Sequence, residues 1–302
     1  MRGNSADIRL YRFNCYFCIR IRDISETKNG KGFINCHFMK SMKRLTLSAA
    51  MLLCILAAVS CNDGIRFEEY GFSGSIALQE GRTDSLSIDI RMEYPEANTA
   101  APAKDRISGT ISATAFGEEY RGIGPQEAVD TYVADYISTY RTENLELAES
   151  LAGEGSMALS WGKYLTGVFS EEMNVITAGT EGVRLINYTI TDYSYTGGAH
   201  GMNTETCLVF NTKTGKQVLL EDIFATDGMA ALPALLMKHV PEAFGNPSDA
   251  DYLLVTEIPV TENFSMSDSG ITFIYNPYEI AAYAAGTIRI TIPWDELQDI
   301  LR

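Results

Sequence analysis

Basic residues are scarce over most of this chain. The whole sequence has 24 Lys and Arg and 39 Asp and Glu, and residues 1–44 hold ten of the basic and three of the acidic residues. Residues 45–302 therefore hold 14 basic and 36 acidic residues, a net charge of −22. Because nucleic-acid affinity depends largely on Lys and Arg that neutralise phosphates, this balance argues against a nucleic-acid partner. It favours cationic partners, or simply solubility.

Cysteine and histidine are also rare. Beyond Cys61 the sequence has one cysteine, Cys207, and two histidines, His200 and His239. Cys207 begins the apolar run Cys207-Leu208-Val209-Phe210, so we predict a buried, inert thiol rather than a nucleophile or half of a disulfide. The chain also lacks the G-x-S-x-G pattern of a nucleophile elbow, which argues against a serine hydrolase of that kind.

A hydrophobic run long enough to cross a membrane is absent as well. The uncharged segment from Leu45 to Val59 is shorter than the roughly 20 residues that a transmembrane helix needs. It follows Met42-Lys43-Arg44, and small residues precede the cysteine in Ala58-Val59-Ser60-Cys61. A short basic region, an apolar core and such an ending are typical of a bacterial lipoprotein signal.

We therefore predict a signal peptide at residues 42–60 and a lipidated Cys61 that begins a tether over residues 61–70. Cleavage without lipidation is the alternative. Residues 1–41 are predicted to be an over-extended start that is not part of the fold, because a secretory signal does not normally begin so far into a protein. Met42 or Met39 would be the true initiator. The expected location is extracytoplasmic, on the periplasmic or cell-surface face of a membrane.

Two groups of residues are considered as metal-binding sites. Cys15-x-x-Cys18 and Cys36-His37 lie in the extension, but their spacing does not give the paired geometry of a zinc knuckle. Asp249 and Asp251 lie in a polar loop that lacks the other ligands of a calcium loop, so a solvated turn is favoured. We predict no metal and no cofactor.

Hydrophobic periodicity predicts the elements of the first half. From Leu86 to Tyr94 apolar and polar residues alternate, as in a half-buried strand. Residues 95–106 are predicted to form a loop and residues 107–116 another strand. A helix is predicted from Gly124-Pro125 to about Ser150, with a stripe of tyrosines packed in the core, because apolar residues recur at three- and four-residue spacing. The segment from Trp161 to Phe169 has no clear assignment.

The second half shows more strands than helices. The expected elements are strands at residues 173–178 and 183–195, a hairpin over 204–220, a helix over about 229–244, strands at 271–275 and 288–292, and a short helix that begins at Pro293. Runs of strands with one long helix in each half indicate an α+β fold. We predict a two-part α+β ectodomain of antiparallel sheets, each packed with a main helix. Its N-terminal domain would cover residues 71–201 and its C-terminal domain residues 202–302.

Three blocks of sequence resemble a known family. They are Tyr195-Thr196-Gly197-Gly198-Ala199-His200-Gly201, then Phe210 to Lys216 running into Leu220-Glu221-Asp222-Ile223-Phe224, then Tyr275 to Gly286 with Ile292 to Leu297. Their order and spacing resemble the extracytoplasmic region of RsiV-type anti-sigma factors and the accessory domain of PdaC-type peptidoglycan deacetylases. The N-terminal domain is similar to the PdaC accessory region and the C-terminal domain to RsiV.

The resemblance implies an α+β ectodomain of the kind found in envelope lipoproteins, and in RsiV-type proteins this ectodomain binds lysozyme. We expect anti-sigma signalling not to carry over, because the sequence shows no sigma-binding segment and no transmembrane helix. Zinc-dependent deacetylation is not expected either, because its metal site needs an aspartate with paired histidines.

The first and third blocks supply the candidate ligand-binding residues, which are Tyr195, Gly197, Gly198, His200, Tyr278 and Tyr283. Glycines hold backbone conformations closed to other residues, and histidine can do acid-base chemistry near neutral pH. Three roles stay open for His200: a backbone hydrogen bond, a ligand contact, or catalysis with Asp192, Ser194 or Glu205. The tyrosines suit a binding platform, although core packing is the commoner role.

We therefore predict an exported, lipid-anchored envelope protein that binds or senses a muramidase, a peptidoglycan fragment or an envelope protein without catalysing a reaction. Its membrane contact would be the lipid on Cys61, and no residue is assigned as catalytic. The alternative is a hydrolase that acts on envelope glycans. That enzyme would need two carboxylates at a catalytic separation in one cleft.

Overall fold

A computed structural model describes residues 65–96, 99–150, 159–175, 183–244 and 252–302 of the chain. Residues 64–302 form one compact unit. Three sequence predictions lie outside the described residues: the lipidated Cys61 with its signal peptide, the cysteine group in the extension, and the loop with Asp249 and Asp251.

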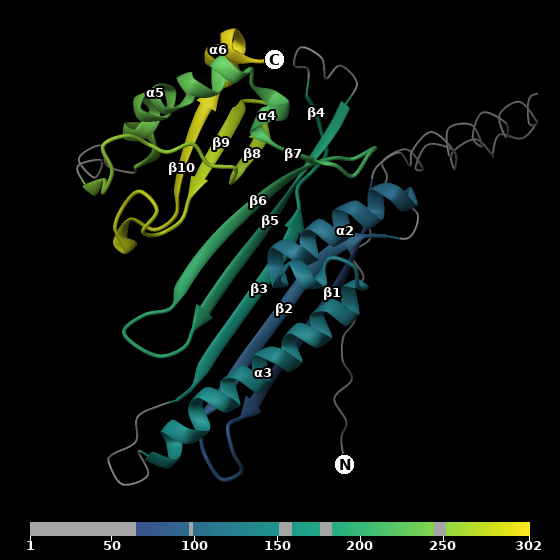
Figure 1. Cartoon of the computed structure of the whole chain (residues 1–302), viewed down its shortest axis with the longest axis vertical. Helices are drawn as coiled ribbons and strands as arrows, with labels where there is room; N and C mark the ends of the chain where they lie inside the picture. Colours follow the sequence, from purple (N-terminus) through teal and green to yellow (C-terminus); the bar gives the residue numbers. More distant parts are fainter. Residues whose placement is uncertain (1–64, 97–98, 151–158, 176–182, 245–251) are drawn as a thin grey trace, which may run out of the picture. The chain divides into compact units, whose positions relative to one another are not determined.

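The described residues form a mixed α+β fold with two sheets, as predicted (Figure 1). The large sheet has seven strands, with β1-β2-β3-β5-β6-β7 in spatial order and β4 paired to β5. Its strands are β1 (Phe67–Ala77), β2 (Ser85–Pro95), β3 (Trp161–Phe169), β4 (Met173–Val175), β5 (Val183–Tyr195), β6 (Met202–Asn211) and β7 (Gln217–Val218). The alternation seen from Leu86 to Tyr94 is confirmed as β2, in which those apolar residues are buried.

One strand pair of the large sheet is parallel. Strands β2 and β3 run in the same direction, with Leu86 opposite Trp161, whereas the other pairs are antiparallel. A parallel pair needs a long crossover connection. Here two helices supply it, α2 (Ala101–Phe116) and α3 (Pro125–Ser150), with the short helix η1 (Glu118–Tyr120) between them.

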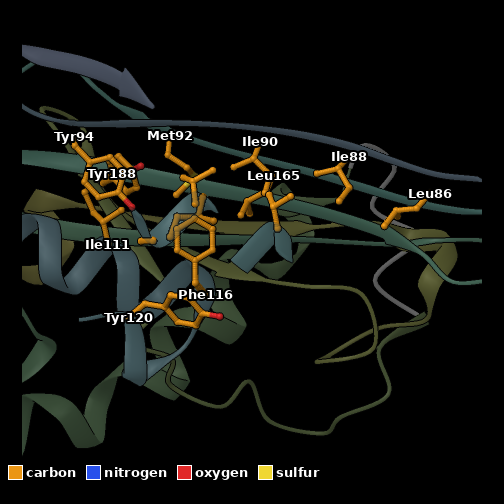
Figure 2. Close-up of a cluster of buried hydrophobic side chains, with 14 of the residues drawn as sticks. Leu86, Ile88, Ile90, Met92, Tyr94, Ile111, Phe116, Tyr120, Leu165 and Tyr188 are labelled. Carbon is orange, nitrogen blue, oxygen red and sulfur yellow. The ribbon is translucent and has the colours of Figure 1, made fainter. Parts of the chain in front are cut away.

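Helices α2 and α3 cover one face of the large sheet (Figure 1). Figure 2 shows the side chains of Leu86, Ile88, Ile90, Met92 and Tyr94 in a row along β2, facing Ile111 and Phe116 of α2. The tyrosine stripe of α3 packs in the same core, where Tyr140 is fully buried and Tyr132 and Tyr136 are half-buried. Burial of this apolar face stabilises the helices, as the core-packing prediction for the stripe required.

The prediction of a loop over 95–106 followed by a strand over 107–116 is wrong, because α2 occupies residues 101–116. Pro102 lies in its first turn, where proline is tolerated. The buried residues Ala103, Ile107 and Ile111 recur every four residues and form the helical face. The β-branched Ile and Thr of this segment favour strands intrinsically, but burial of that face outweighs their propensity.

The unassigned segment from Trp161 to Phe169 is strand β3. Its inward positions are Lys163, Leu165 and Gly167, which are buried, whereas Tyr164 and Val168 are exposed. A lysine and a glycine at inward positions hide the alternation that marks β2.

A smaller, three-stranded antiparallel sheet packs with the second main helix. Its strands are β8 (Phe264–Ser267), β9 (Gly270–Tyr275) and β10 (Ile288–Pro293), in the order β10-β9-β8. Helix α5 (Thr226–Ala243) buries Leu232, Leu236 and Val240 against it and contains two prolines. Short helices α4 (Leu220–Ile223) and α6 (Trp294–Leu297) complete this part, and α6 begins directly after Pro293, one residue later than predicted.

Asparagine side chains join the two sheets. The Asn187 side chain on β5 donates to the Met266 carbonyl at 2.9 Å and accepts from the Met266 N–H at 3.0 Å. Asn263 likewise accepts from the Cys207 N–H and donates to the Glu205 carbonyl, both at 2.8 Å. These side chains satisfy buried backbone groups as a neighbouring strand would. The predicted boundary between residues 201 and 202 falls in the loop between β5 and β6, which pair over most of their length.

Cys207 is a free, buried thiol, as predicted. Burial raises the pKa of this thiol, which keeps it in the unreactive protonated form. No helix among the described residues is long and apolar enough to span a membrane.

Candidate functional site

The six candidate ligand-binding residues lie at two loops. Tyr195 ends β5, Gly197, Gly198 and His200 belong to the loop that joins β5 to β6, and Tyr278 and Tyr283 belong to the loop that joins β9 to β10. The second loop contains the short helix η3 (Tyr283–Ala285). The fold brings these loops into contact, although they are far apart in the sequence.

His200, Tyr283 and Tyr278 form one aromatic row. The imidazole of His200 stacks on the Tyr283 ring with 3.9 Å between centroids and an interplanar angle of 21°. The ring centroids of Tyr278 and Tyr283 are 5.8 Å apart, and the two rings are tilted by 33°. The Tyr283 hydroxyl donates to the Gly201 carbonyl at 2.8 Å, which links the two loops. We call His200, Tyr283 and Tyr278 the aromatic row.

The row is accessible to a ligand. The Tyr278 side chain is 53% exposed, His200 is exposed and Tyr283 is half-buried. Tyr275, the last residue of β9, is buried in the core and so fits the core-packing interpretation. Of the three tyrosines in this block, one therefore packs in the core and two form the row.

Tyr278 adopts a strained backbone conformation. Its φ of 72° is the only positive value of a non-glycine residue in the described part of the chain. Surrounding hydrogen bonds impose this conformation: the Tyr278 N–H donates to the Ala281 carbonyl at 3.0 Å, and the Asn276 N–H donates to the Glu279 carboxylate at 2.8 Å. Strain of this kind costs on the order of 1–3 kcal/mol and persists where the fold enforces it, often at functional sites.

The glycines of the β5–β6 loop have two different roles. Gly197 and Gly198 have φ values of 102° and 89°, which side chains other than glycine rarely adopt, and the Tyr195 hydroxyl closes the turn by donating to the Gly198 carbonyl at 3.0 Å. Gly201 has no positive φ. A Cβ atom there would collide with the hydroxyl end of Tyr193, so any other residue would have to displace the Tyr193 ring.

The residues that support the row were not predicted from the sequence. Asn276 accepts from the Glu205 N–H at 2.7 Å and donates to the Glu205 carbonyl at 3.1 Å, which anchors the β9–β10 loop on β6. Glu205 also forms an ion pair with Arg289 of β10. The one sequence signal for such a turn is the pair Asn276-Pro277 directly before Tyr278.

The two carboxylates considered as catalytic partners of His200 do not converge. The Nδ1 atom of His200 lies 3.0 Å from the carbonyl of the next residue, Gly201. Asp192 binds the Lys163 ammonium on the helix-covered face of the sheet, whereas Glu205 is aligned with Thr191, whose side chain lies on the opposite face. Each carboxylate is thus neutralised by its own cation, and the two cannot act on one bond.

No group of three or more His, Cys, Asp and Glu in the described part of the chain could hold a metal ion. The row presents aromatic rings that can stack on a ligand and tyrosine hydroxyl groups that can hydrogen-bond to it.

Comparison with known proteins identifies part of the chain. Residues 221–295 match the family described as "Protein of unknown function (DUF3298)", so the chain carries a DUF3298 domain there. This span includes Tyr278 and Tyr283 but not His200. No curated protein matches the chain.

Two solved structures resemble it. A crystal structure of a DUF3298 family member from Bacteroides fragilis matches with a TM-score of 0.69 and 28% identity, and the match covers 79% of this chain and 94% of that chain. A DUF3298 family protein from Pseudomonas aeruginosa matches with a TM-score of 0.56 and 16% identity, covering 80% and 96%. The second likeness is one of fold alone.

Proposed function

We propose that this chain is an exported, lipid-anchored binding module of the bacterial cell envelope that catalyses no reaction. Its ligand would be a muramidase, a peptidoglycan fragment or another envelope protein, and would contact the aromatic row. The signal-like segment that ends at Cys61 supports the envelope location. The resemblance of the three sequence blocks to RsiV-type and PdaC-type regions supports the ligand class.

The aromatic row is the observation that carries this proposal. An exposed tyrosine offers a large, rigid contact surface with a polar tip, and such residues dominate the energetics of many binding sites. Tyr278 presents its ring from a backbone conformation that the loop hydrogen bonds enforce. Because the backbone that carries the ring is fixed before binding, a ligand loses little affinity to ordering this loop.

The hydrolase alternative is less well supported. Glycosidases use two carboxyl groups that flank one scissile bond. Asp192 and Glu205, the carboxylates nearest to His200 in the sequence, lie on opposite faces of the sheet and are each paired with a cation. A binding module requires no such pair.

Calorimetric titration of the full chain with a basic muramidase, and separately with soluble peptidoglycan fragments, tests the proposal. Attraction that rests on net charge alone fades as salt screens it, whereas a packed contact persists. We expect micromolar or tighter binding at near-physiological salt for at least one of these ligands. Tyr278→Ala should weaken it roughly tenfold or more.

Two matched variants serve as controls. Leu147→Ala removes another exposed apolar side chain, 40% exposed on α3, and should leave binding unchanged. Tyr278→Gly removes the ring and also relieves the positive φ, so it should bind as weakly as Tyr278→Ala but unfold at a higher denaturant concentration. Equal affinity of Tyr278→Ala and the unaltered chain would refute the assignment of the row.

Membrane fractionation tests the anchor separately. Cys61→Ser should move the protein from the membrane to the soluble fraction, because a lipid anchor binds through buried methylene groups. A native Cys61 peptide without lipid mass would contradict this part of the proposal.

A further inference from the structure

We propose that Tyr164 and Tyr193 extend the aromatic row into a longer track that binds a linear, uncharged glycan strand. This inference rests on the proposed binding function and names its ligand class. Neither tyrosine emerged from the sequence as a candidate, and each lies outside the matched DUF3298 span.

Tyr164 and Tyr193 lie side by side on the face of the large sheet that α2 and α3 leave uncovered. They are direct partners on β3 and β5, and their ring centroids are 5.9 Å apart. The neighbours of Tyr164 along β3, Lys163 and Leu165, point to the helix-covered core, so the Tyr164 ring points away from it. Tyr164 is 47% exposed, which is unusual for a large side chain in the middle of a sheet.

Gly201 connects this pair to the aromatic row. The hydroxyl end of Tyr193 lies against Gly201, where a Cβ atom would fit only if the Tyr193 ring moved. The carbonyl of the same glycine accepts the hydrogen bond of Tyr283, whose ring stacks on His200. The order along the track is therefore Tyr164, Tyr193, Gly201, Tyr283 with His200, and Tyr278, with exposed rings at both ends.

The surroundings of the tyrosine pair carry little free charge. Asp89, the β2 partner of Tyr164, is bound by both Nε and Nη2 of Arg91, at 2.9 and 2.7 Å. Glu205 is bound by Arg289. The other cross-strand neighbours present neutral polar groups, namely Thr166, Thr191 and Asn203. In a chain with a net charge of −22 over residues 45–302, this is a locally neutral surface.

These properties fit a glycan strand better than a basic protein. A pyranose ring has apolar C–H faces that stack on aromatic rings and a polar rim that hydrogen-bonds to hydroxyl and amide groups, as an amphipathic platform requires. A basic partner would instead favour unpaired carboxylates. Two separated aromatic platforms also favour a ligand of several sugar units over a single sugar.

Titration of the full chain with a soluble, uncharged N-acetylglucosamine tetramer, and with the monomer as a length control, tests the inference. We expect the tetramer to bind with an affinity that is unchanged between about 0.02 and about 0.5 M salt, since no ion pairs form. The monomer should bind much more weakly. Tyr164→Ala and Tyr278→Ala should each weaken tetramer binding roughly three- to tenfold, and Tyr164→Phe should retain it, because the ring face remains.

Leu147→Ala is the matched control, and melting temperatures show that each variant is folded. Absence of tetramer binding overturns the glycan assignment. Tetramer binding that Tyr164→Ala leaves unchanged overturns the extended track. In either case, the chain could still bind a muramidase, and a loss of that binding in Tyr278→Ala would support the proposed function. Failure of the glycan inference is therefore distinguishable from failure of the proposed function.

Discussion

The Lys163 ammonium donates hydrogen bonds to both carboxylate oxygens of Asp192, at 2.6 and 2.7 Å. Lys163 is buried on the inward face of β3, and its Nζ atom lies 5.9 Å from the ring centroid of Tyr132 and 5.7 Å from that of Tyr136. Helix α3 therefore closes over an ion pair that joins β3 to β5. Asp192 has a structural partner, which leaves it unsuited to catalysis with His200.

Breaking this pair should destabilise the fold. Asp192→Ala leaves the Lys163 charge buried without a counter-charge, and we expect a loss of about 2–3 kcal/mol in the free energy of unfolding. This lies below the 3–5 kcal/mol typical of fully buried pairs, because the Asp192 side chain is 31% exposed. Urea unfolding measures the loss.

The double variant Lys163→Met with Asp192→Leu is the control for this prediction. Replacing both charges by apolar side chains of similar size removes the uncompensated charge, so most of the lost stability should return. A double variant that is no more stable than Asp192→Ala would contradict the assignment of a buried ion pair.

A substitution at Gly201 tests whether the space next to Tyr193, rather than the backbone conformation of the glycine, matters for binding. Gly201→Ala pushes the Tyr193 ring aside, and because a side-chain end can move, we expect a stability loss of at most about 1.5 kcal/mol. Displacement of Tyr193 should nevertheless weaken tetramer binding severalfold. Calorimetry and thermal unfolding on the same samples measure both effects.

Gly81 is the matched glycine. It has a φ of 83°, no atom lies within 4 Å of where its Cβ would be, and it belongs to the β1–β2 turn. Gly81→Ala should cost about 1 kcal/mol from backbone strain and leave glycan binding unchanged. If both alanines affected binding equally, the packing of Tyr193 on Gly201 would not explain the result.

Local patterns predicted much of this fold, and the exceptions have physical causes. Strand β2 and helix α3 have buried faces of regular period, so their sequences reveal them. Strand β3 does not, because Lys163 is buried only through Asp192 on another strand. The β-branched residues of α2 point to a strand until the face it buries is known.

Some features of the candidate site could likewise be predicted from the sequence, and others could not. The glycines of the β5–β6 loop could be predicted because two of them need a positive φ. The stacking of His200 on Tyr283 could not, since it depends on how Asn263 and Asn276 hold β6 against the small sheet. Tyr164 and Tyr193 are ordinary strand residues in sequence, and only the arrangement of β3 beside β5 makes them a pair.

The contact between the sheets gives a third prediction. Asn263→Ala removes the acceptor of the Cys207 N–H and one of two donors to the Glu205 carbonyl. An unsatisfied, partly buried N–H should lower the free energy of unfolding by about 1–3 kcal/mol. Asn203→Ala, at an exposed asparagine of the same strand β6, should change it by less than about 0.5 kcal/mol.

The substitution Asn263→Asp refines that test. It keeps the acceptor for the Cys207 N–H but places a second acceptor against the Glu205 carbonyl, so it should also destabilise the fold. Chemical denaturation compares the four proteins. If Asn263→Asp were as stable as the unaltered chain, the hydrogen bond from Asn263 to the Glu205 carbonyl would contribute nothing.

Asp84 should make stability depend on pH in the acid range. The hydrogen bond from the Leu159 N–H, at 2.8 Å, and then the Arg82 guanidinium hold the pKa of this buried carboxyl below its usual value, although burial itself raises it. A group whose pKa is lower in the folded state stabilises the fold above its unfolded pKa of about 3.9. That contribution is lost as the pH falls through the lower folded value.

Asp84→Asn should therefore lower the free energy of unfolding by about 1–2 kcal/mol near neutral pH, because it removes charge-assisted hydrogen bonds. The difference between the variant and the unaltered chain should shrink as the pH falls below about 4, where residue 84 becomes protonated in the unfolded chain, and should be lost as the pH falls through the lower folded pKa of Asp84. Urea unfolding at several pH values measures this difference. Glu80→Gln, at an exposed carboxylate of the same β1–β2 turn, should show little effect at any pH. A difference between Asp84→Asn and the unaltered chain that stays constant down to about pH 3 would mean that the charge of Asp84 does not stabilise the contact with Leu159.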